Sequence, residues 1–304
     1  MKFILFLATQ KGYEYLRAFI AYDKSLIGAV FSFEEVNVKE NYYPLIRDEC
    51  LKNNISFFDW KQNKNNLEKI VVSQHITHVI LIGWRYLLNE KINSILEEKM
   101  IIYHDSLLPK YRGFAPTPSA IIKGEKYIGF SVIFAEKEMD SGDIIYQEKY
   151  ELKNDYYLKD VVNILSEGYA NSIPIVLNNL KVKNYFAQDH NKATYSCWRD
   201  IKDMQIDWNK SSKDIFNFIR ALSEPLLGAY SYLNGKKVII KKSQIIEQDI
   251  DFEIRYPGKL WKINKNNAIV ICGQGLLQIT DCYDENNSKI IFKNLRQRFE
   301  YISD

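Results

Sequence analysis

The first half of the chain alternates between short apolar runs and amphipathic stretches, and this alternation limits the fold more than any other feature. Strands that alternate with helices are typical of parallel βαβ units. We therefore predict an α/β fold with a Rossmann-like, mainly parallel sheet. The strand-like runs are Phe3–Leu7, Leu26–Phe33, Ile55–Phe58, His78–Ile82 and Met100–Tyr103, and the helical patterns lie near Gly12–Tyr22, Tyr42–Asn53, Asn65–Gln74 and Asn89–Glu98.

The pattern changes after residue 104 but stays within the same predicted domain. A loop leads to a helical segment at Pro116–Lys123, and two strand-like runs follow at Ile128–Ala135 and Asp143–Glu151, which predict a hairpin. A long amphipathic stretch, Leu158–Leu180, would then complete the domain. We predict that this catalytic domain covers residues 1–182.

The last third of the chain predicts a second, smaller domain. Residues 183–205 are polar and irregular, which predicts a linker, and residues 206–304 would form a β-rich, OB-like C-terminal domain. The dipeptide Asn234-Gly235 is a strong hairpin signal. The remaining elements are a helix at Ser212–Leu222 and strands at Ala229–Leu233, Lys237–Ile246, Pro257–Ile263, Ala268–Ile271 and Leu276–Thr280.

The composition excludes several classes of protein. The chain has 41 basic and 38 acidic residues, and a net charge of +3 is too small to indicate a nucleic acid or a membrane surface as partner. No stretch approaches the roughly 18 apolar residues of a membrane span. The apolar start is too short for a signal peptide and runs into Gln10-Lys11-Gly12. The four cysteines form no CxxC pair, so we expect neither a zinc site nor a disulfide framework. We expect a cytoplasmic protein.

One histidine and one aspartate stand out as candidates for chemistry. His104 follows the apolar run Met100–Tyr103, and open α/β sheets bind ligands at the carboxyl ends of their strands. Asp140 comes 36 positions later in a turn-like sequence. A histidine paired with a carboxylate permits general-base chemistry near neutral pH. Taken from the residues alone, a structural role for either side chain stays open.

The sequence around these two residues resembles a known family. The motif His104-x-Ser106-Leu107-Leu108-Pro109-Lys110-Tyr111-Arg112-Gly113, followed by Asp140-x-Gly142-Asp143, is similar to the signature of N10-formyltetrahydrofolate-dependent formyltransferases. The second domain extends the match, because Ile206-Asp207-Trp208, Ile219-Arg220-Ala221, Gly228-Ala229-Tyr230 and Pro257-Gly258 resemble methionyl-tRNA formyltransferases. They resemble still more the formyltransferase domain that acts on UDP-4-amino-4-deoxyarabinose. The resemblance thus points to the nucleotide-sugar N-formyltransferase branch.

The resemblance implies an N-formyltransferase, an enzyme whose co-substrate is N10-formyltetrahydrofolate. His104 would take the proton of the attacking amine or support the tetrahedral intermediate, and Asp140 would orient His104 and stabilise its charge. The pterin of the folate would meet the loop after the fourth strand, largely through backbone groups. This loop is Gly83, Trp84, Arg85, Tyr86 and Leu87. Ordinary packing remains an alternative role for Trp84 and Tyr86.

The chain departs from the family at Ile102. The family has an asparagine two residues before its histidine, and residues two apart on a strand share a face, so Ile102 should lie beside His104. The asparagine donates a hydrogen bond to the developing oxyanion, and loss of one such donor costs about 10²–10³ in rate. Tyr103 and Asp105 are adjacent but are expected to point elsewhere. Another group could replace the donor, or the chain could be slow, altered in chemistry, or a folate or nucleotide-sugar binding protein without turnover.

The acceptor predicted from the sequence is a nucleotide-linked deoxy-amino sugar, carried on dTDP or UDP and used in surface glycan synthesis. Lys110 and Arg112 would lie near its diphosphate, because arginine suits bidentate phosphate contacts, although exposed loop charges remain the alternative reading. Methionyl-tRNA is the competing acceptor. Those enzymes carry a basic insertion after the second strand, whereas Ser32–Glu40 is short and acidic here. The C-terminal domain could extend the sugar-nucleotide site, form a homodimer interface, or stabilise the fold.

Overall fold

The computed structural model describes residues 1–35, 39–86, 99–248 and 250–302, and these residues form two compact units. The first unit comprises Met1–Pro116, Tyr127–Glu151 and Asp160–Ser196. The second comprises Thr117–Lys126, Leu152–Lys159 and Cys197–Asp304. The units are therefore discontinuous in sequence, and the division into 1–182, 183–205 and 206–304 stays a prediction.

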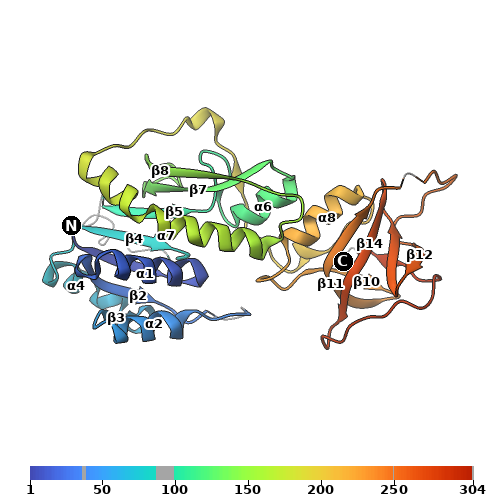
Figure 1. The fold of residues 1–304 in the computed structure, drawn as a ribbon, viewed down its shortest axis with the longest axis horizontal. Coiled ribbons are helices and arrows are strands. Elements are labelled where there is room, and N and C mark those ends of the chain that lie inside the picture. Colours follow the sequence, from blue (N-terminus) through green and yellow to red (C-terminus); the bar gives the residue numbers. More distant parts are fainter. Residues whose placement is uncertain (36–38, 87–98, 249, 303–304) are drawn as a thin grey trace. The chain divides into compact units, whose positions relative to one another are not determined.

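A seven-stranded sheet forms the middle of the first unit (Figure 1). Its order is β3-β2-β1-β4-β5-β7-β8, in which the first five strands are parallel to one another and β7 pairs antiparallel with both β5 and β8. The order 3-2-1-4-5 is that of a Rossmann sheet. This confirms the prediction of a Rossmann-like, mainly parallel sheet. The strands are β1 (Phe3–Leu7), β2 (Ile27–Ser32), β3 (Ser56–Asp59), β4 (His78–Ile82), β5 (Met100–His104), β7 (Tyr127–Phe134) and β8 (Ile144–Glu151).

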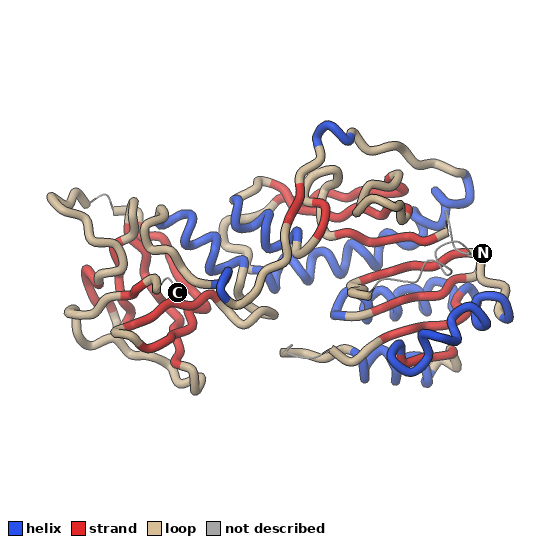
Figure 2. Tube along the Cα trace, turned by 180° about the vertical axis from the view of Figure 1, so that it is seen from behind, coloured by secondary structure: helices blue, strands red, loops and turns tan. Residues whose placement is uncertain are grey.

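Strand β1 shows why its sequence is a continuous apolar run. Successive side chains of a strand point to opposite faces, and both faces of this sheet are covered by helices. Phe3 packs against Phe19 of helix α1, with ring centroids 5.6 Å apart, whereas Phe6 packs against Trp60 of helix α3 at 5.8 Å. All five residues of β1 are buried. Figure 2 shows the strands and their covering helices from behind.

The helices of this unit agree with most of the predicted segments. They are α1 (Thr9–Asp23), α2 (Tyr43–Lys52), α3 (Trp60–Asn63), α4 (Leu67–Ser73) and α7 (Leu158–Val182), of which α7 begins in the second unit, with short 3-10 turns at Lys24–Leu26, Lys64–Asn66 and His190–Lys192. The predicted helix Asn89–Glu98 lies outside the described residues. No helix in the described ranges is both long and apolar enough to span a membrane.

The second unit is a six-stranded antiparallel sheet of order β12-β13-β14-β11-β10-β15. An antiparallel bridge between Lys259 and Arg298, beside β12 and β15, joins the two edges and closes the sheet. A β-rich C-terminal domain is thus confirmed. Trp208 stacks on Phe299 in its core. The elements are α6 (Pro116–Lys123, of which Pro116 belongs to the first unit), the 3-10 turn Lys202–Met204, α8 (Ser212–Ala221), β10 (Ala229–Leu233), β11 (Lys236–Ile246), β12 (Leu260–Asn264), β13 (Asn267–Ile271), β14 (Leu276–Asp284) and β15 (Phe299–Glu300).

Part of the segment predicted as a linker belongs to the first unit. Strand β9 (Tyr195–Ser196) pairs in parallel with β6 (Arg112–Gly113), which lies in the loop after β5. The backbone N–H of Arg112 donates to the carbonyl oxygen of Thr194 at 2.8 Å, and that of Phe114 donates to Ser196 at 3.0 Å. Residues 194–196 therefore hold the loop in which the candidate site lies.

Candidate functional site

His104 is the last residue of β5, and its side chain is buried. Its Nε2 lies 2.9 Å from the backbone carbonyl oxygen of Tyr111. A carbonyl oxygen only accepts hydrogen bonds, so Nε2 carries a proton and donates it to this oxygen. Tyr111 has a φ of 60°, a left-handed conformation that non-glycine residues rarely adopt. The loop after β5 thus fixes the orientation of the imidazole ring.

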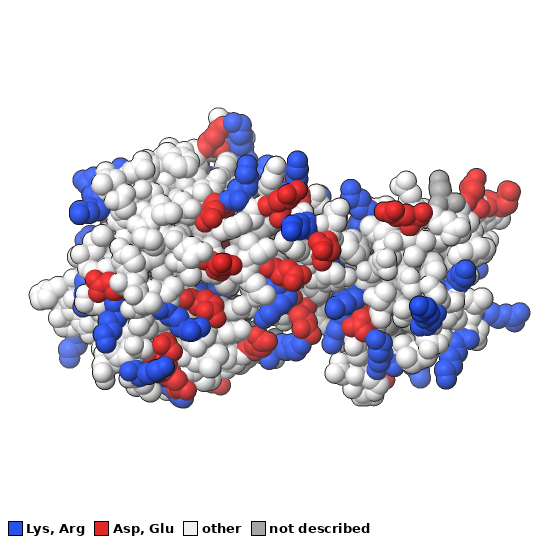
Figure 3. Space-filling model, in the orientation of Figure 1, with Lys and Arg blue, Asp and Glu red and all other residues white. Residues whose placement is uncertain are grey.

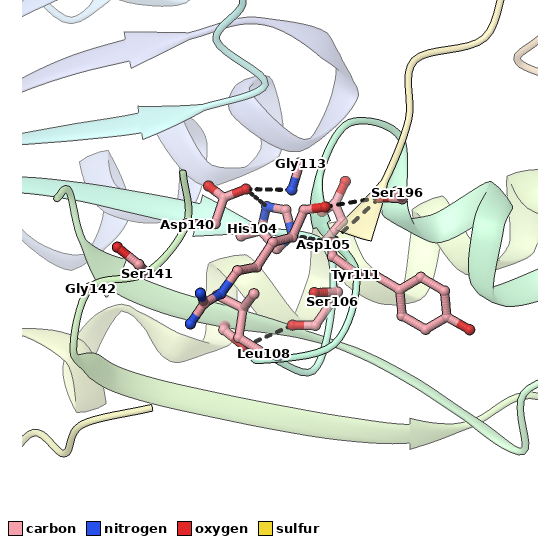
Figure 4. A network of polar contacts seen from close by, with 12 residues as sticks. His104, Asp105, Ser106, Leu108, Tyr111, Gly113, Asp140, Ser141, Gly142 and Ser196 are labelled. Carbon is pink, nitrogen blue, oxygen red and sulfur yellow. Dashed lines mark hydrogen bonds and ion pairs between the residues drawn. The ribbon is translucent and has the colours of Figure 1, made fainter. Parts of the chain in front are cut away.

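Asp140 lies on the other side of the imidazole (Figure 4). Its Oδ2 is 3.5 Å from Nδ1 of His104 and also accepts the backbone N–H of Gly113 at 2.7 Å. Because Nε2 already donates to Tyr111, Nδ1 can donate to Asp140 only when the ring carries both protons. The arrangement is therefore suited to stabilising an imidazolium. Asp140 has a φ of 51°, and backbone strain of this kind occurs at functional sites when the surroundings hold it.

Gln188 holds the turn that carries Asp140. Its Nε2 donates to the backbone carbonyl oxygens of Asp140 at 2.8 Å and Gly142 at 2.7 Å. Its Oε1 accepts from Arg112, at 3.2 Å from Nε and 2.7 Å from Nη2. Sequence reasoning missed Gln188, since a glutamine in a polar segment predicted as a linker carries no signal of such a contact.

The loop from Ser106 to Lys110 is fixed by side chains of the β7–β8 hairpin. Ser131 Oγ accepts the backbone N–H of Leu108 at 3.0 Å and donates to the carbonyl oxygen of Ser106 at 2.7 Å. Gln147 Nε2 donates to that hydroxyl and to the carbonyl oxygen of Leu108, at 2.8 and 2.9 Å. These bonds place the His104 loop on a rigid element, as precise chemistry requires.

His104 and Asp140 line a cavity of about 420 Å³. Ile102 lies in the same wall, as its two-residue spacing from His104 predicts. Ile102 also packs against a buried cluster of Leu108, Ile133 and Ile144, so it forms an apolar wall beside the imidazole. Tyr103 and Asp105 also contribute to the cavity wall, but the side chain of Tyr103 points elsewhere, as expected, with its hydroxyl 3.3 Å from that of Tyr15.

The loop after β4 forms another wall of the cavity through Gly83, Trp84, Arg85 and Tyr86. Leu87, the fifth predicted residue, lies outside the described residues. Gly83 has a φ of +64°, and a Cβ there would come 2.8 Å from the carbonyl oxygen of Ala8, so the backbone conformation requires glycine. Arg85 pairs with the buried carboxylate of Glu35, with Nη2 2.7 Å from Oε1. Burial raises the pKa of this carboxyl, and Arg85 opposes that rise.

Trp84 packs in the interior and also lines the cavity, and its contact with the folate stays a prediction. It packs edge to face against Phe6, with ring centroids 4.7 Å apart, and against Phe33 at 5.2 Å, and it also lines the cavity. Its indole Nε1 is buried and has no hydrogen-bond partner within the ranges that the structure covers. This atom has almost no exposed surface, so the indole N–H faces packed side chains and not the open cavity.

The structure places the two predicted diphosphate contacts away from the cavity wall. Lys110 is exposed. Arg112 is only 2% exposed, and its guanidinium contacts Gln188 and His190, with Nη2 3.0 Å from Nδ1 of His190. This geometry favours a structural role for Arg112, and a diphosphate contact by either residue stays a prediction.

A second charged group lies beside His104. The ammonium of Lys11, in the first turn of α1, pairs with the carboxylate of Asp105, which also accepts the hydroxyl of Tyr169 at 2.5 Å. Burial would raise the pKa of Asp105, but the charge and hydrogen bond of Lys11 and the bond from Tyr169 hold it below its usual value. Sequence reasoning missed Lys11. Its position just after the first strand of an α/β sheet was the available signal.

Comparison with known proteins identifies relatives for both parts of the chain. Residues 36–177 match the family described as formyl transferase, and residues 200–299 match its C-terminal domain. A methionyl-tRNA formyltransferase of Sulfurihydrogenibium sp. is 32% identical over 76% of this chain and 75% of that protein. The bifunctional polymyxin resistance protein ArnA of Wigglesworthia glossinidia brevipalpis is 30% identical over 97% of this chain. This chain spans only 47% of that relative's length.

A solved structure shares the fold of this chain. It is an N-formyltransferase from Helicobacter canadensis in complex with folinic acid and dTDP-3-aminofucose. The alignment has a TM-score of 0.66 at 17% identity and covers 92% of this chain and 99% of that one. At this identity the match supports the fold alone.

Proposed function

The chain belongs to the formyl transferase family, whose formyl donor is N10-formyltetrahydrofolate. From this premise we propose that it formylates the amine of a nucleotide-linked deoxy-amino sugar. The sugar would be carried on dTDP or UDP, and its product would serve surface glycan synthesis. The His104–Asp140 pair in the cavity wall is the observation that carries the chemical part of this proposal, because it combines a titratable ring with an oriented carboxylate.

The reaction needs one proton removed from the amine and one delivered to the donor. The amine nitrogen forms a bond to the formyl carbon, and the carbonyl electron pair moves to oxygen. When that pair returns, the bond to N10 breaks, and N10 receives a proton. No electron is transferred overall. His104 receives the proton of the amine at Nδ1, which carries no proton in the neutral ring, and Asp140 stabilises the imidazolium through that atom. N10 receives this proton when its bond to the formyl carbon breaks, so the ring ends neutral. Such proton transfer contributes about 10²–10⁴ in rate.

The cavity has features that fit the pterin of the donor. Its wall includes the apolar side chains of Leu81, Met100 and Ile102 and the backbone of the loop after β4. A flat heterocycle combines large apolar faces with polar edges, and pockets of this kind supply few, well-placed polar groups. The loop of Gly83, Trp84, Arg85 and Tyr86 is therefore the proposed pterin site.

Two observations support the sugar nucleotide as acceptor. The Helicobacter canadensis neighbour, whose complex contains dTDP-3-aminofucose, aligns over nearly all of its own length. On the face of the first unit drawn in Figure 3, basic and acidic side chains are interspersed. Proteins that bind RNA concentrate Lys and Arg along the backbone of the nucleic acid. A small charged acceptor suits this surface better than a tRNA does.

Methionyl-tRNA is the second candidate acceptor, and the sequence relatives favour it. The Sulfurihydrogenibium enzyme is more similar in sequence than the sugar N-formyltransferase neighbour, at 32% against 17% identity. These identities are averaged over the whole alignment, so they do not separate residues of the formyl-transfer site from residues that bind the acceptor. The two acceptors are therefore separated by experiment and not by similarity.

One assay tests both acceptors. Purified protein is mixed with N10-formyltetrahydrofolate and a panel of dTDP- and UDP-linked amino sugars, or with initiator methionyl-tRNA, and tetrahydrofolate release is followed by absorbance. We expect at least one amino sugar to raise the rate tenfold or more above the rate without acceptor, with mass spectrometry showing the formylated product. Turnover with methionyl-tRNA alone would assign the second candidate, and folate binding without any acceptor-dependent turnover would exclude both.

A further inference from the structure

The proposed reaction does not use Lys11, a charged residue of the cavity wall. Lys11 lines the same cavity as Ile102 and His104, and its side chain is only 12% exposed. Burial of an ammonium is unfavourable unless a partner compensates it, and Asp105 is that partner. A buried ion pair contributes little net stability on average, so its presence beside a reactive site calls for another explanation.

Lys11 has more hydrogen-bond donors than its partner uses. An ammonium has three N–H bonds, and the carboxylate of Asp105 accepts one of them. Within the described ranges, the other contact of the ammonium is the ring of Tyr169, whose centroid is 5.9 Å from Nζ. Two N–H bonds therefore remain for a ligand in the cavity.

Formyl transfer is assisted by a hydrogen-bond donor near the formyl oxygen. Negative charge develops on the formyl oxygen as the amine adds to the carbon, and donors held in advance near that oxygen stabilise it. Ile102 lies in the cavity wall and has no side-chain donor. We infer that Lys11 donates a hydrogen bond to the formyl oxygen as this charge develops and so takes the place of a donor at position 102.

Neighbouring side chains hold Lys11 for this role. Asp105 immediately follows His104 in the chain and fixes Nζ through the ion pair. Tyr169 of α7 donates to the second oxygen of Asp105, and its ring packs against Tyr103 and Phe130, with centroids 4.7 Å away in each case. Asp105 and Tyr169 are thus positioning residues, and Lys11 is the group that would touch the reacting atoms.

The test compares Lys11→Met with Lys11→Arg, which keeps a cationic donor, and with Lys24→Met, an exposed lysine just beyond the same helix. Formyl release is measured with the acceptor found above and also without acceptor, since hydrolysis of the donor passes through the same oxyanion. Binding of 5-formyltetrahydrofolate is measured by calorimetry. We expect Lys11→Met to lower kcat by about 10²-fold in both reactions, with the dissociation constant changed less than threefold. Lys24→Met should match the wild type, and Lys11→Arg should keep at least a tenth of its rate.

A rescue experiment separates this role from a structural one. In Lys11→Met the carboxylate of Asp105 loses its ion-pair partner, which can lower the unfolding temperature. If it does, the double variant Lys11→Met/Asp105→Asn, which also removes the negative charge, is tested in its place. Adding Ile102→Asn to either variant should restore kcat at least tenfold. Unchanged kcat in Lys11→Met, or no recovery with Ile102→Asn in a folded protein, would overturn the inference.

The inference rests on formyl transfer and not on the identity of the acceptor, so the two proposals fail separately. Hydrolysis that depends on Lys11, without turnover of any amino sugar, would exclude the sugar acceptor and support Lys11. Turnover of an amino sugar at an unchanged rate in Lys11→Met would support the sugar acceptor and overturn the role of Lys11. Absence of any protein-dependent formyl release would overturn both.

Discussion

Gln188 donates a hydrogen bond from Nε2 to the backbone carbonyl oxygen of Asp140, at a distance of 2.8 Å, although 48 positions separate the two residues. The same amide group binds Gly142, so Gln188 closes the turn on both sides of Ser141. In this turn the backbone at residue 140 is left-handed, and the carboxylate of Asp140 faces His104.

Gln188→Leu should therefore lower activity more than binding. Without the amide, two buried carbonyl oxygens lose their donor, at about 1–3 kcal/mol for each such group, and the turn can relax. We expect kcat to fall about tenfold while the KM for the folate changes less than threefold. Asn191→Ala, an exposed residue of the same segment, is the control. A wild-type kcat in Gln188→Leu would show that the turn holds its geometry without this contact.

His104→Ala and Asp140→Ala should each lower the rate of formyl transfer by about 10²–10⁴-fold, because each removes one half of the proton-accepting pair. The thermal midpoint is recorded alongside the release of tetrahydrofolate, so that loss of fold is recognised. Asp140→Asn keeps an acceptor for the Gly113 N–H but lacks the charge, so it should be nearly as inactive. Retained activity in His104→Ala would overturn the assigned role.

Arg112→Met separates a diphosphate contact from a structural one. The buried guanidinium donates twice to Gln188, so we expect a lower unfolding free energy, by about 3 kcal/mol, because its buried partners lose their donors. The KM for the sugar nucleotide should stay within threefold. A KM that rises tenfold or more in a protein of wild-type stability would favour the diphosphate contact instead, and Lys110→Met is measured in parallel.

Ile102→Asn alone should change kcat less than threefold if Lys11 already supplies the donor. Ile102 packs against Leu108, Ile133 and Ile144, so placing an amide there should also lower the unfolding free energy, by about 1–3 kcal/mol. Ile102→Val, which keeps an apolar wall, is the matched control. A tenfold or larger gain in kcat would mean that the natural site is short of a donor, against the role assigned to Lys11.

Asp105 should make folding sensitive to acid. Lys11 and Tyr169 lower its pKa in the folded protein, so the folded state binds this proton more weakly than the unfolded chain, whose aspartate pKa is about 3.9. The contribution to stability is complete above that value and is lost as the pH falls through the folded pKa. Between pH 5 and pH 3, followed by urea unfolding, Asp105→Asn should lose stability less steeply than the wild type. The largest slope difference that one proton permits is about 1.4 kcal/mol per pH unit. Equal slopes of unfolding free energy against pH in Asp105→Asn and the wild type would show that the fold does not hold Asp105 in its charged form.

The sequence by itself determined the parts of the fold that local periodicity encodes. The limits of β1 and β4 match the predicted apolar runs, and β2, β3 and β5 differ from theirs by a residue at one or both ends. Strand periodicity also placed Ile102 beside His104, because residues two apart share a face whatever the surrounding fold. The family signature brought His104 and Asp140 together as a pair before any distance was known.

Tertiary structure alone decided which distant side chains complete the site. Lys11 meets Asp105 across 94 positions, and Gln188 meets Arg112 and Asp140 from a segment that reads as a linker. Contacts of this kind depend on the order of the strands in the sheet and on where loops cross its edge, and local periodicity carries no information on either. The strand order brings the end of β1 close to that of β5, two strands away across β4, and so places the ammonium of Lys11 in the same cavity wall as His104 and Ile102.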